Sequence, residues 1–191
     1  MSGRTPGKVR IVAGSRRGRR LRVPPGEATR PTSEKVREAI FDVLGPVAGL
    51  RVLDLFAGTG AMGLEALSRG ARSCVFVEGD PAVAGVLREN IAALEYDADC
   101  RVINAGYVRA LGALAQGEPG FDLLFVDPPY RMLAEVEAMV TPLMSSLLSV
   151  DGVAVVEGDR ATRVTLGQHP VFDRTYGDTR VVMIGMRRSI R

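Results

Sequence analysis

The chain has 191 residues, 46% of them hydrophobic and 25% charged, which is enough for one globular domain with an appendage. It contains no apolar run near the roughly 20 residues of a membrane span, and no apolar segment follows its basic N-terminus as a secretory signal requires. We therefore expect a cytoplasmic protein that acts as a monomer and away from membranes. The only histidine is His169, so histidine metal sites and histidine-dependent triads are not expected, and no metal is predicted.

The net charge of +3 is distributed unevenly along the chain. Residues 1–37 contain eleven Arg and Lys against two Glu, a net charge of +9, whereas the remainder has fourteen basic and twenty acidic residues, a net charge of −6. A basic arm on a mildly acidic body predicts an anionic partner, with nucleic acid as the first candidate. The alternative is a solvated tail that only keeps the protein soluble.

The arm shows two short alternating stretches, "KVRIVAG" and "RRLRVP", on either side of "SRRG". Val9, Ile11, Leu21 and Val23 are apolar, and arginines stand between and beside them, which predicts a β-hairpin with a basic tip and outer face. We assign residues 1–30 to this RNA-binding extension. The residues expected to bind RNA are Arg10, Arg16, Arg17, Arg19, Arg20, Arg22 and Arg30.

A helix is predicted next, in "TSEKVREAIFDVL", capped by Thr32 or Ser33 and closed by Gly45 and Pro46. Short apolar strands then alternate with amphipathic helices. Strands are predicted at 51–57, 73–79, 100–105, 121–127, 152–158, 169–177 and 179–188, and helices at 61–70, 81–96, 107–116 and 133–148.

This alternation predicts an α/β, Rossmann-like, doubly wound and mostly parallel sheet over residues 31–191, closed by a C-terminal antiparallel hairpin. Cys74 and Cys100 lie in two of the strands. We expect them to be reduced core thiols rather than a disulfide.

The first strand runs into a glycine loop, "DLFAGTGAMGLEAL", of the kind that carries a nucleotide-like ligand at a helix N-terminus. Gly58, Gly60 and Gly63 match G-x-G-x-x-G, so a dinucleotide must be considered. Asp54 favours S-adenosylmethionine, because an acid there can engage the methionine ammonium, directly or through water, and would repel a pyrophosphate. Glu78 can accept both ribose hydroxyls, a feature shared with NAD enzymes. The expected cofactor residues are Asp54, Phe56, Gly58, Thr59, Gly60, Glu78, Gly79, Asn104 and Ala105.

The fourth strand ends in "DPPY", residues 127–130, beside the first strand in this topology. The exocyclic amine of a nucleobase is a poor nucleophile, because its lone pair is delocalised into the ring. The Asp127 carboxylate and the Pro128 carbonyl can each accept one N–H and direct the lone pair at a methyl group, while the ring of Tyr130 stacks on the base. A paired base would have to be flipped out. We expect Asp127, Pro128 and Tyr130 to be catalytic.

These motifs resemble known families. "LDLFAGTGAMGLEAL" and "DPPY" are similar to class I amino-methyltransferases, whereas "VRIVAGSRRGRRL", "RPTSEKVREAIFDVL" and "YGDT" resemble the bacterial 16S rRNA guanine-N2 methyltransferases of the RsmD family, from Val9 to about Val182. The resemblance implies methyl transfer from S-adenosylmethionine to a guanine N2 of 16S rRNA, in the 30S subunit or a late assembly precursor. It places Asp54, Gly58, Gly60 and Glu78 on cofactor positions, and Asp127 and Tyr130 on the catalytic motif.

One position departs from the pattern of such enzymes, which often carry an acid after the third strand that binds the adenine amino group. This chain has Ala105 and Gly106 there, so backbone groups near Asn104 are expected to hold the adenine.

Other functions share parts of this pattern. They are a DNA or RNA adenine-N6 methyltransferase, a protein glutamine methyltransferase, an NAD oxidoreductase and a non-catalytic rRNA-binding assembly factor. A DNA enzyme usually needs a target-recognition domain, and the glutamine enzymes typically have Asn where Asp127 stands. An oxidoreductase leaves "DPPY" unexplained, and an assembly factor needs no intact catalytic motif.

Overall fold

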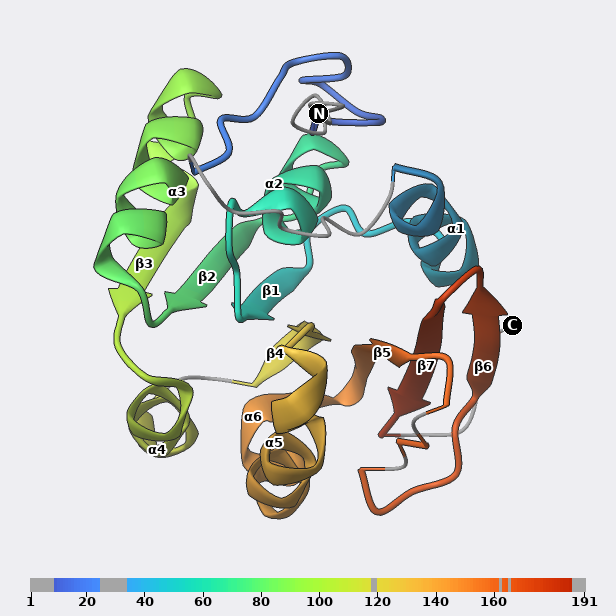
Figure 1. Cartoon of the computed structure of the whole chain (residues 1–191). Coiled ribbons are helices and arrows are strands. Elements are labelled where there is room, and N and C mark those ends of the chain that lie inside the picture. Colours follow the sequence, from blue (N-terminus) through green and yellow to red (C-terminus); the bar gives the residue numbers. More distant parts are fainter. Residues whose placement is uncertain (1–8, 25–33, 118–119, 162, 165, 187–191) are drawn as a thin grey trace, which may run out of the picture.

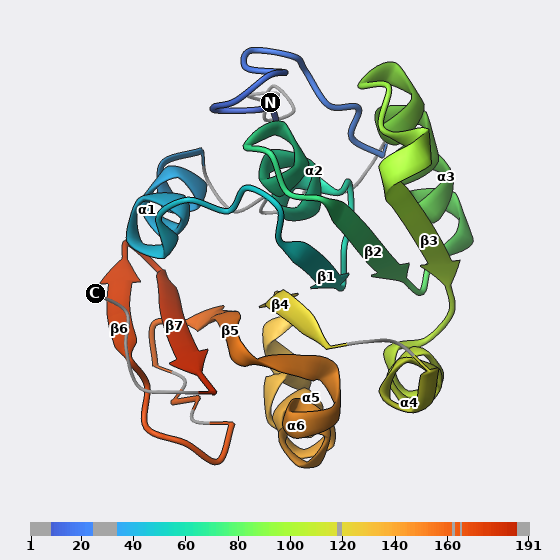
Figure 2. The same ribbon diagram turned by 180° about the vertical axis from the view of Figure 1, so that it is seen from behind.

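The computed structural model describes residues 9–24, 34–117, 120–161, 163–164 and 166–186. The described strands form one sheet in the order β3-β2-β1-β4-β5-β7-β6 (Figures 1 and 2). The first five strands in this order pair in parallel, and β7 pairs antiparallel with β5 and β6. The predicted Rossmann-like sheet with a closing antiparallel hairpin is therefore confirmed.

The strands are β1 (Arg51–Leu55), β2 (Ser73–Glu78), β3 (Cys100–Asn104), β4 (Phe121–Val126), β5 (Leu148–Asp159), β6 (Phe172–Tyr176) and β7 (Thr179–Gly185). The α-helices are α1 (Glu34–Leu44), α2 (Ala61–Ser68), α3 (Pro81–Ala93), α4 (Tyr107–Gly117), α5 (Leu133–Val140) and α6 (Met144–Leu147). Short 3₁₀ helices span Asp97–Asp99, Tyr130–Met132 and Thr141–Leu143.

Helices cover both faces of the sheet, with α1, α2 and α3 on one side and α4, α5 and α6 on the other (Figure 1). Each face has its own hydrophobic core, because side chains alternate along a strand. In β1, Val52 packs in the core beneath α1 to α3, whereas Leu53 and Leu55 pack in the core beneath α4 to α6. This alternation turns Asp54 toward α2.

One predicted helix is wrong in its continuity. The expected helix 133–148 is broken into α5, a 3₁₀ turn and α6, because Pro142 lies at the start of that turn and has no N–H to continue a helical ladder. Strand β5 also begins at Leu148, earlier than predicted, with a register shift against β4 between Phe121 and Leu123. The predicted caps Thr32 and Ser33 lie outside the described residues.

Residues 9–24, called the arm below, lie across the ends of α2 and α3 (Figure 1). The chain doubles back with one antiparallel bridge, Arg10 to Arg20, and no strand forms within these residues, so the predicted hairpin lacks a β-ladder. The reason is that a side chain of the domain occupies backbone groups that a ladder would need: Glu65 accepts the N–H groups of Val12 and Ala13. The predicted alternation still holds for packing, since Val9, Ile11 and Leu21 are buried in the core beneath α1 to α3.

The remaining sequence expectations concern single residues. Cys74 and Cys100 stand opposite each other in β2 and β3 as free thiols, which confirms the prediction of reduced cysteines. His169 is exposed. Across the described ranges, no helix is both long and apolar enough to cross a bilayer.

Candidate active site

The strand order reverses between β1 and β4, and this is where ligands bind in open α/β sheets. The two strands are parallel neighbours whose last paired residues are Leu55 and Val126. Phe56 and Asp127 therefore begin two adjacent loops at the same edge. This confirms the predicted position of the D-P-P-Y segment beside the glycine loop.

The glycine loop leads from β1 into α2, and Gly60 is the residue before the first helical turn. Its φ is 83°, and a Cβ at this position would lie 2.4 Å from Leu87 Cδ1, so only glycine fits without displacement. At the start of the loop, the N–H groups of Phe56 and Ala57 both donate to the Val77 carbonyl, at 3.1 and 2.9 Å. The loop is thereby held against the end of β2.

Asp54 lies beneath the loop and is 4% exposed. Its Oδ2 accepts the Gly63 N–H at 2.9 Å, which holds the first turn of α2. Burial raises the pKa of the Asp54 carboxyl, the Gly63 hydrogen bond opposes this, and the negative charges of Asp127 and Glu78 add to the rise, so that the pKa is about 7. The carboxyl groups at the ends of β1, β2 and β4 are thus close enough to repel one another.

Glu78 ends β2 and is half-buried. Its Oε2 accepts the Gly58 N–H at 2.9 Å, and its Oε1 accepts the Asp80 N–H at 2.8 Å. Each carboxylate oxygen has two lone-pair sites, so both can accept a further hydroxyl. Asn104 links the next strand to this position, because its Nδ2 donates to the Glu78 carbonyl at 2.8 Å and to the Gly79 carbonyl at 3.4 Å.

The turns after β2 and β3 lie side by side, since a Cβ on Gly79 would stand 3.9 Å from the Ala105 carbonyl oxygen. Phe56 has a φ of 75°, which is unusual for a residue with a side chain. Its ring centroid lies 5.1 Å from that of Tyr107. The Tyr107 hydroxyl donates to Glu135, and this hydrogen bond, with burial, raises the pKa of Tyr107 to about 12. A strained loop residue is thus held by a phenol that stays neutral.

The D-P-P-Y segment is short and tightly turned. Pro128 is buried, Pro129 is exposed, and Asp127 and Tyr130 are half-buried. The Pro129 carbonyl accepts the Met132 N–H at 2.7 Å, so Tyr130 begins a 3₁₀ turn. The predicted catalytic residues therefore lie together in one short turn.

Six of the predicted RNA-binding arginines lie on the arm, and Arg30 lies outside the described residues. Several are tied to the domain. Arg16 donates to the Leu94 carbonyl and to Glu95, both at 2.9 Å. The other contacts are Arg19 to the Ala93 carbonyl at 2.7 Å, Arg22 to Glu89 at 2.6 Å and Arg10 to Glu34 at 3.0 Å. Arg17 and Arg20 are exposed, and their side chains bond to none of the described residues.

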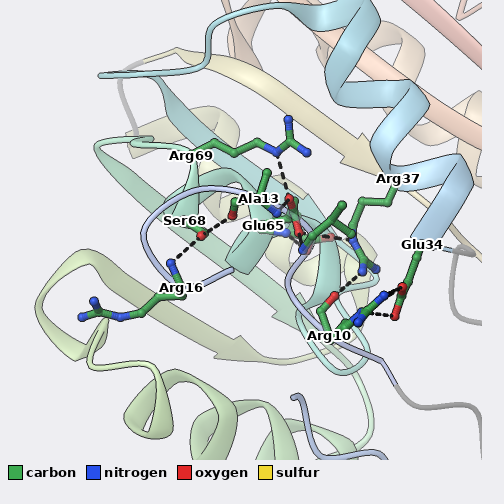
Figure 3. Close-up of polar contacts among 11 residues, drawn as sticks. Arg10, Ala13, Arg16, Glu34, Arg37, Glu65, Ser68 and Arg69 are labelled. Atoms are coloured by element: carbon green, nitrogen blue, oxygen red, sulfur yellow. Dashed lines mark hydrogen bonds and ion pairs between the residues drawn. The ribbon is translucent and has the colours of Figure 1, made fainter. Parts of the chain in front are cut away.

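Sequence reasoning missed the polar residues that dock the arm, shown in Figure 3. Glu65 and Arg37 are fully buried, with Arg37 Nε 3.5 Å from Glu65 Oε2 and Arg69 Nε 2.8 Å from Glu65 Oε1. The Arg37 Nη2 donates to the Arg10 carbonyl. Burial lowers the pKa of Arg37, against the nearby charge of Glu65. The sequence offered one signal for these residues: Arg37 lies among the apolar residues of α1, and Glu65 among those of α2.

No cluster of metal-ligating side chains is found in the part of the chain that the structure describes.

Comparison with known proteins places the chain in a family. Residues 9–185 match the model of the family described as conserved hypothetical protein 95. The chain belongs to this family. A relative from Bacillus subtilis, "Putative rRNA methyltransferase YlbH", is 39% identical over 94% of this chain and 100% of its own length. "Ribosomal RNA small subunit methyltransferase D" of Haemophilus influenzae is 36% identical over 81% of this chain and 80% of its own.

Solved structures agree with the family. A hypothetical protein of Thermus thermophilus superimposes with a TM-score of 0.80 and 32% identity, over 92% of this chain and 98% of that one. The resemblance inferred from the arm, the α1 segment and the D-P-P-Y motif is confirmed at the level of the family.

Proposed function

We propose that the protein transfers a methyl group from S-adenosylmethionine to the exocyclic N2 of one guanine in 16S rRNA. The family and the names of the relatives support an rRNA methyltransferase. The choice of guanine N2 comes from the resemblance of the arm and α1 motifs and is tested below. The proposed substrate is this RNA within the 30S subunit or within a late assembly precursor.

The observation that carries this proposal is the acidic edge formed by Asp54, Glu78 and Asp127. Burial, with the charges of Asp127 and Glu78, raises the pKa of Asp54 to about 7. No Lys or Arg among the described residues forms an ion pair with Asp54 or Glu78. Such an edge repels a pyrophosphate. It attracts a ligand with an ammonium and a sulfonium, which are the two cations of S-adenosylmethionine.

The residues present fit this cofactor in three places. Asp54 would meet the ammonium, directly or through water, and the free lone pairs of Glu78 would accept the ribose hydroxyls. Backbone groups at Gly79, Asn104 and Ala105 would bound the adenine. Phe56, Gly58, Thr59 and Gly60 complete the predicted binding loop. The bound cofactor supplies an electrophilic methyl group.

The D-P-P-Y turn orients the nucleophile. The Asp127 carboxylate and the Pro128 carbonyl accept the two N–H groups of the guanine amine, so the nitrogen lone pair points at the methyl carbon. The cofactor would supply the methyl group and its sulfur would keep the electron pair of the broken C–S bond, while Asp127 or water would take the extra proton from the nitrogen. The Tyr130 ring stacks on the base, a contact worth ~1–3 kcal/mol.

The arm is the proposed RNA-binding element, because two of its six arginines, Arg17 and Arg20, are exposed, with side chains that bond to none of the described residues, while its backbone is held by the domain. Arg17 and Arg20 are the strongest candidates for phosphate contacts, since neither side chain bonds to a described residue. Arg10, Arg16, Arg19 and Arg22 would have to exchange their present partners for phosphate.

The test is methylation of 30S subunits from a strain that lacks this enzyme, with labelled S-adenosylmethionine and nucleoside analysis of the product. We expect N2-methylguanosine at one position. Asp127→Ala should lose at least ~100-fold in rate, the scale of a lost preorganised electrostatic contact, with affinity for S-adenosylhomocysteine within a few-fold.

Asp127→Asn is the matched control, because its Oδ1 can still accept one N–H, and it should retain more activity than Asp127→Ala. N6-methyladenosine as the product would refute the guanine assignment. A near wild-type rate for Asp127→Ala would refute the mechanism.

A further inference from the structure

We propose that Asn90 is a positioning residue that couples the arm to the glycine loop, so that RNA held by the arm tightens binding of the cofactor. This inference rests on the proposed function, because it takes the loop as the cofactor site and the arm as the RNA site. It adds a connection between two sites that lie on separate segments of the chain.

Asn90 lies on the buried face of α3 and is 2% exposed. Its Oδ1 accepts the Arg22 N–H at 2.7 Å, and its Nδ2 donates to the Arg22 carbonyl at 3.1 Å. The same Nδ2 donates to the Thr59 carbonyl at 3.0 Å. A primary amide has two N–H donors, and both are used here, one on the arm and one on the loop.

The Thr59 peptide is at the centre of the glycine loop. On one side of it, the Gly58 N–H donates to Glu78, the predicted ribose ligand. On the other side, the Thr59 carbonyl is held by Asn90. A displacement of Asn90 would therefore shift the loop at Thr59. The shift would disturb the loop N–H groups and, through Gly58, the orientation of the Glu78 carboxylate.

The position of the Asn90 amide in turn depends on the arm. The paired contacts to the N–H and carbonyl of Arg22 fix the amide plane, as a backbone partner does in a β-ladder. An arm that RNA holds in this docked position keeps Asn90 on Thr59, whereas an undocked arm leaves a buried amide with two unmet groups. Linkage then requires that cofactor and RNA strengthen each other's binding by the same factor.

A second anchor makes this connection separable from the folding of the arm. Glu65 holds the arm at Val12 and Ala13. Loss of the Arg22 contact therefore leaves the arm attached at its first half. A substitution at residue 22 can cut the link to the loop without removing the arm.

The experiment uses a matched pair at residue 22. Arg22→Pro removes the N–H that Asn90 accepts, and Arg22→Ala removes the same charged side chain but keeps the N–H. Binding of tritiated S-adenosylhomocysteine is measured by equilibrium dialysis, with and without saturating 30S subunits from a strain that lacks the enzyme. Asn90→Ala, checked for folding by thermal denaturation, is a second variant that cuts the link from the other side.

In the wild-type protein we expect 30S subunits to tighten S-adenosylhomocysteine binding by at least about fivefold, the lower end of ordinary coupling. Arg22→Ala should keep this factor once the subunits are saturating. Arg22→Pro and Asn90→Ala should reduce it to near one. An equal factor in Arg22→Pro and Arg22→Ala would overturn the coupling while the proposed function stands. No binding of S-adenosylhomocysteine to the wild-type protein would overturn the proposed function and this inference with it.

Discussion

The arm and the acidic sheet edge use the same contact in two different ways. In both, a carboxylate on the domain accepts backbone N–H groups: Glu65 holds Val12 and Ala13 of the arm, while Glu78 holds Gly58 of the glycine loop. The difference lies in burial and countercharge. Glu65 is fully buried, and its negative charge is neutralised within the protein by ion pairs with Arg37 and Arg69.

At the sheet edge, the negative charges of the carboxylates are not neutralised in this way. Glu78 is half-buried, and neither Glu78 nor Asp54 has a cationic partner among the described residues. A carboxylate that holds a backbone turn is thus structural when arginines neutralise it. It remains available to a cationic ligand when its only close charges are other carboxylates. The predictions below test each side of this difference.

The largest expected effect is on stability, from removal of the compensated carboxylate. Glu65→Ala leaves the Arg37 guanidinium buried without its countercharge, which should lower the free energy of unfolding by about 3–5 kcal/mol in urea denaturation. The double variant Arg37→Leu with Glu65→Leu should recover much of this loss, because no buried charge remains. Arg180→Ala, in an exposed pair with Asp173, should cost less than about 1 kcal/mol. An unchanged stability for Glu65→Ala would remove the distinction between the two regions.

The next effect is on cofactor binding, from removal of the carboxylate proposed to hold the ribose. Glu78→Ala should weaken S-adenosylhomocysteine binding by about 1.5–3 kcal/mol, the range of hydrogen bonds to a charged group. Calorimetry measures this directly. Asp173→Ala is the control, since it removes an equal charge in β6, at the edge of the sheet, and it should leave the affinity within a few-fold. Unchanged affinity in Glu78→Ala would take Glu78 out of the cofactor site.

A third effect concerns pH. The folded-state pKa of Asp54 is raised to about 7, so in the free protein this carboxyl is largely protonated at pH 6 and largely ionised at pH 8. A ligand ammonium binds the ionised form. The ionised fraction of Asp54 rises about tenfold from pH 6 to pH 8, so the affinity for S-adenosylhomocysteine should rise by about the same factor. Asp54→Asn should flatten this profile, and a wild-type affinity independent of pH would contradict a contact between Asp54 and the ammonium.

The fold could be read from the sequence because its signals are local. A glycine or proline follows each of the first four strands within three residues: Gly58, Gly79, Gly106 and Pro128. The glycine loop and D-P-P-Y follow strands that the alternation pattern places side by side. The break in the 133–148 helix also had a local signal in Pro142, which the apolar pattern outweighed.

The docking of the arm could not be read in this way, because its partners are distant in sequence. Glu65 meets Val12 across 53 positions, and Asn90 meets Arg22 across 68. A charged or amide residue in a helix normally indicates a solvated face, and only the packed structure turns Glu65, Asn90 and Arg37 toward the arm. The alternation of apolar residues correctly predicted which arm residues are buried, because they pack on the domain. It did not predict that contacts with the domain would replace a β-ladder within the arm.

The smallest expected effect is on the salt dependence of RNA binding, and it tests whether the outward side of the arm meets phosphate. Arg17→Ala with Arg20→Ala removes the two arm arginines whose side chains bond to no described residue, so neither change disturbs a docking contact. Each phosphate contact contributes about 0.7–0.9 to the slope of log K against log salt concentration, and the double variant should flatten the slope by ~1.5. Affinity for S-adenosylhomocysteine alone should not change.

The matched control for this charge removal is Arg160→Ala with Arg174→Ala, two exposed arginines in the C-terminal part of the chain. It lowers the net charge equally and should leave the slope close to that of the wild type, because the contacts are local to the arm. Binding of 30S subunits is measured from about 50 to about 200 mM salt with all three proteins. Equal slopes for the two double variants would mean that net charge alone attracts the RNA. The arm would then be a solubilising segment that the buried residues Glu65 and Asn90 merely hold in place.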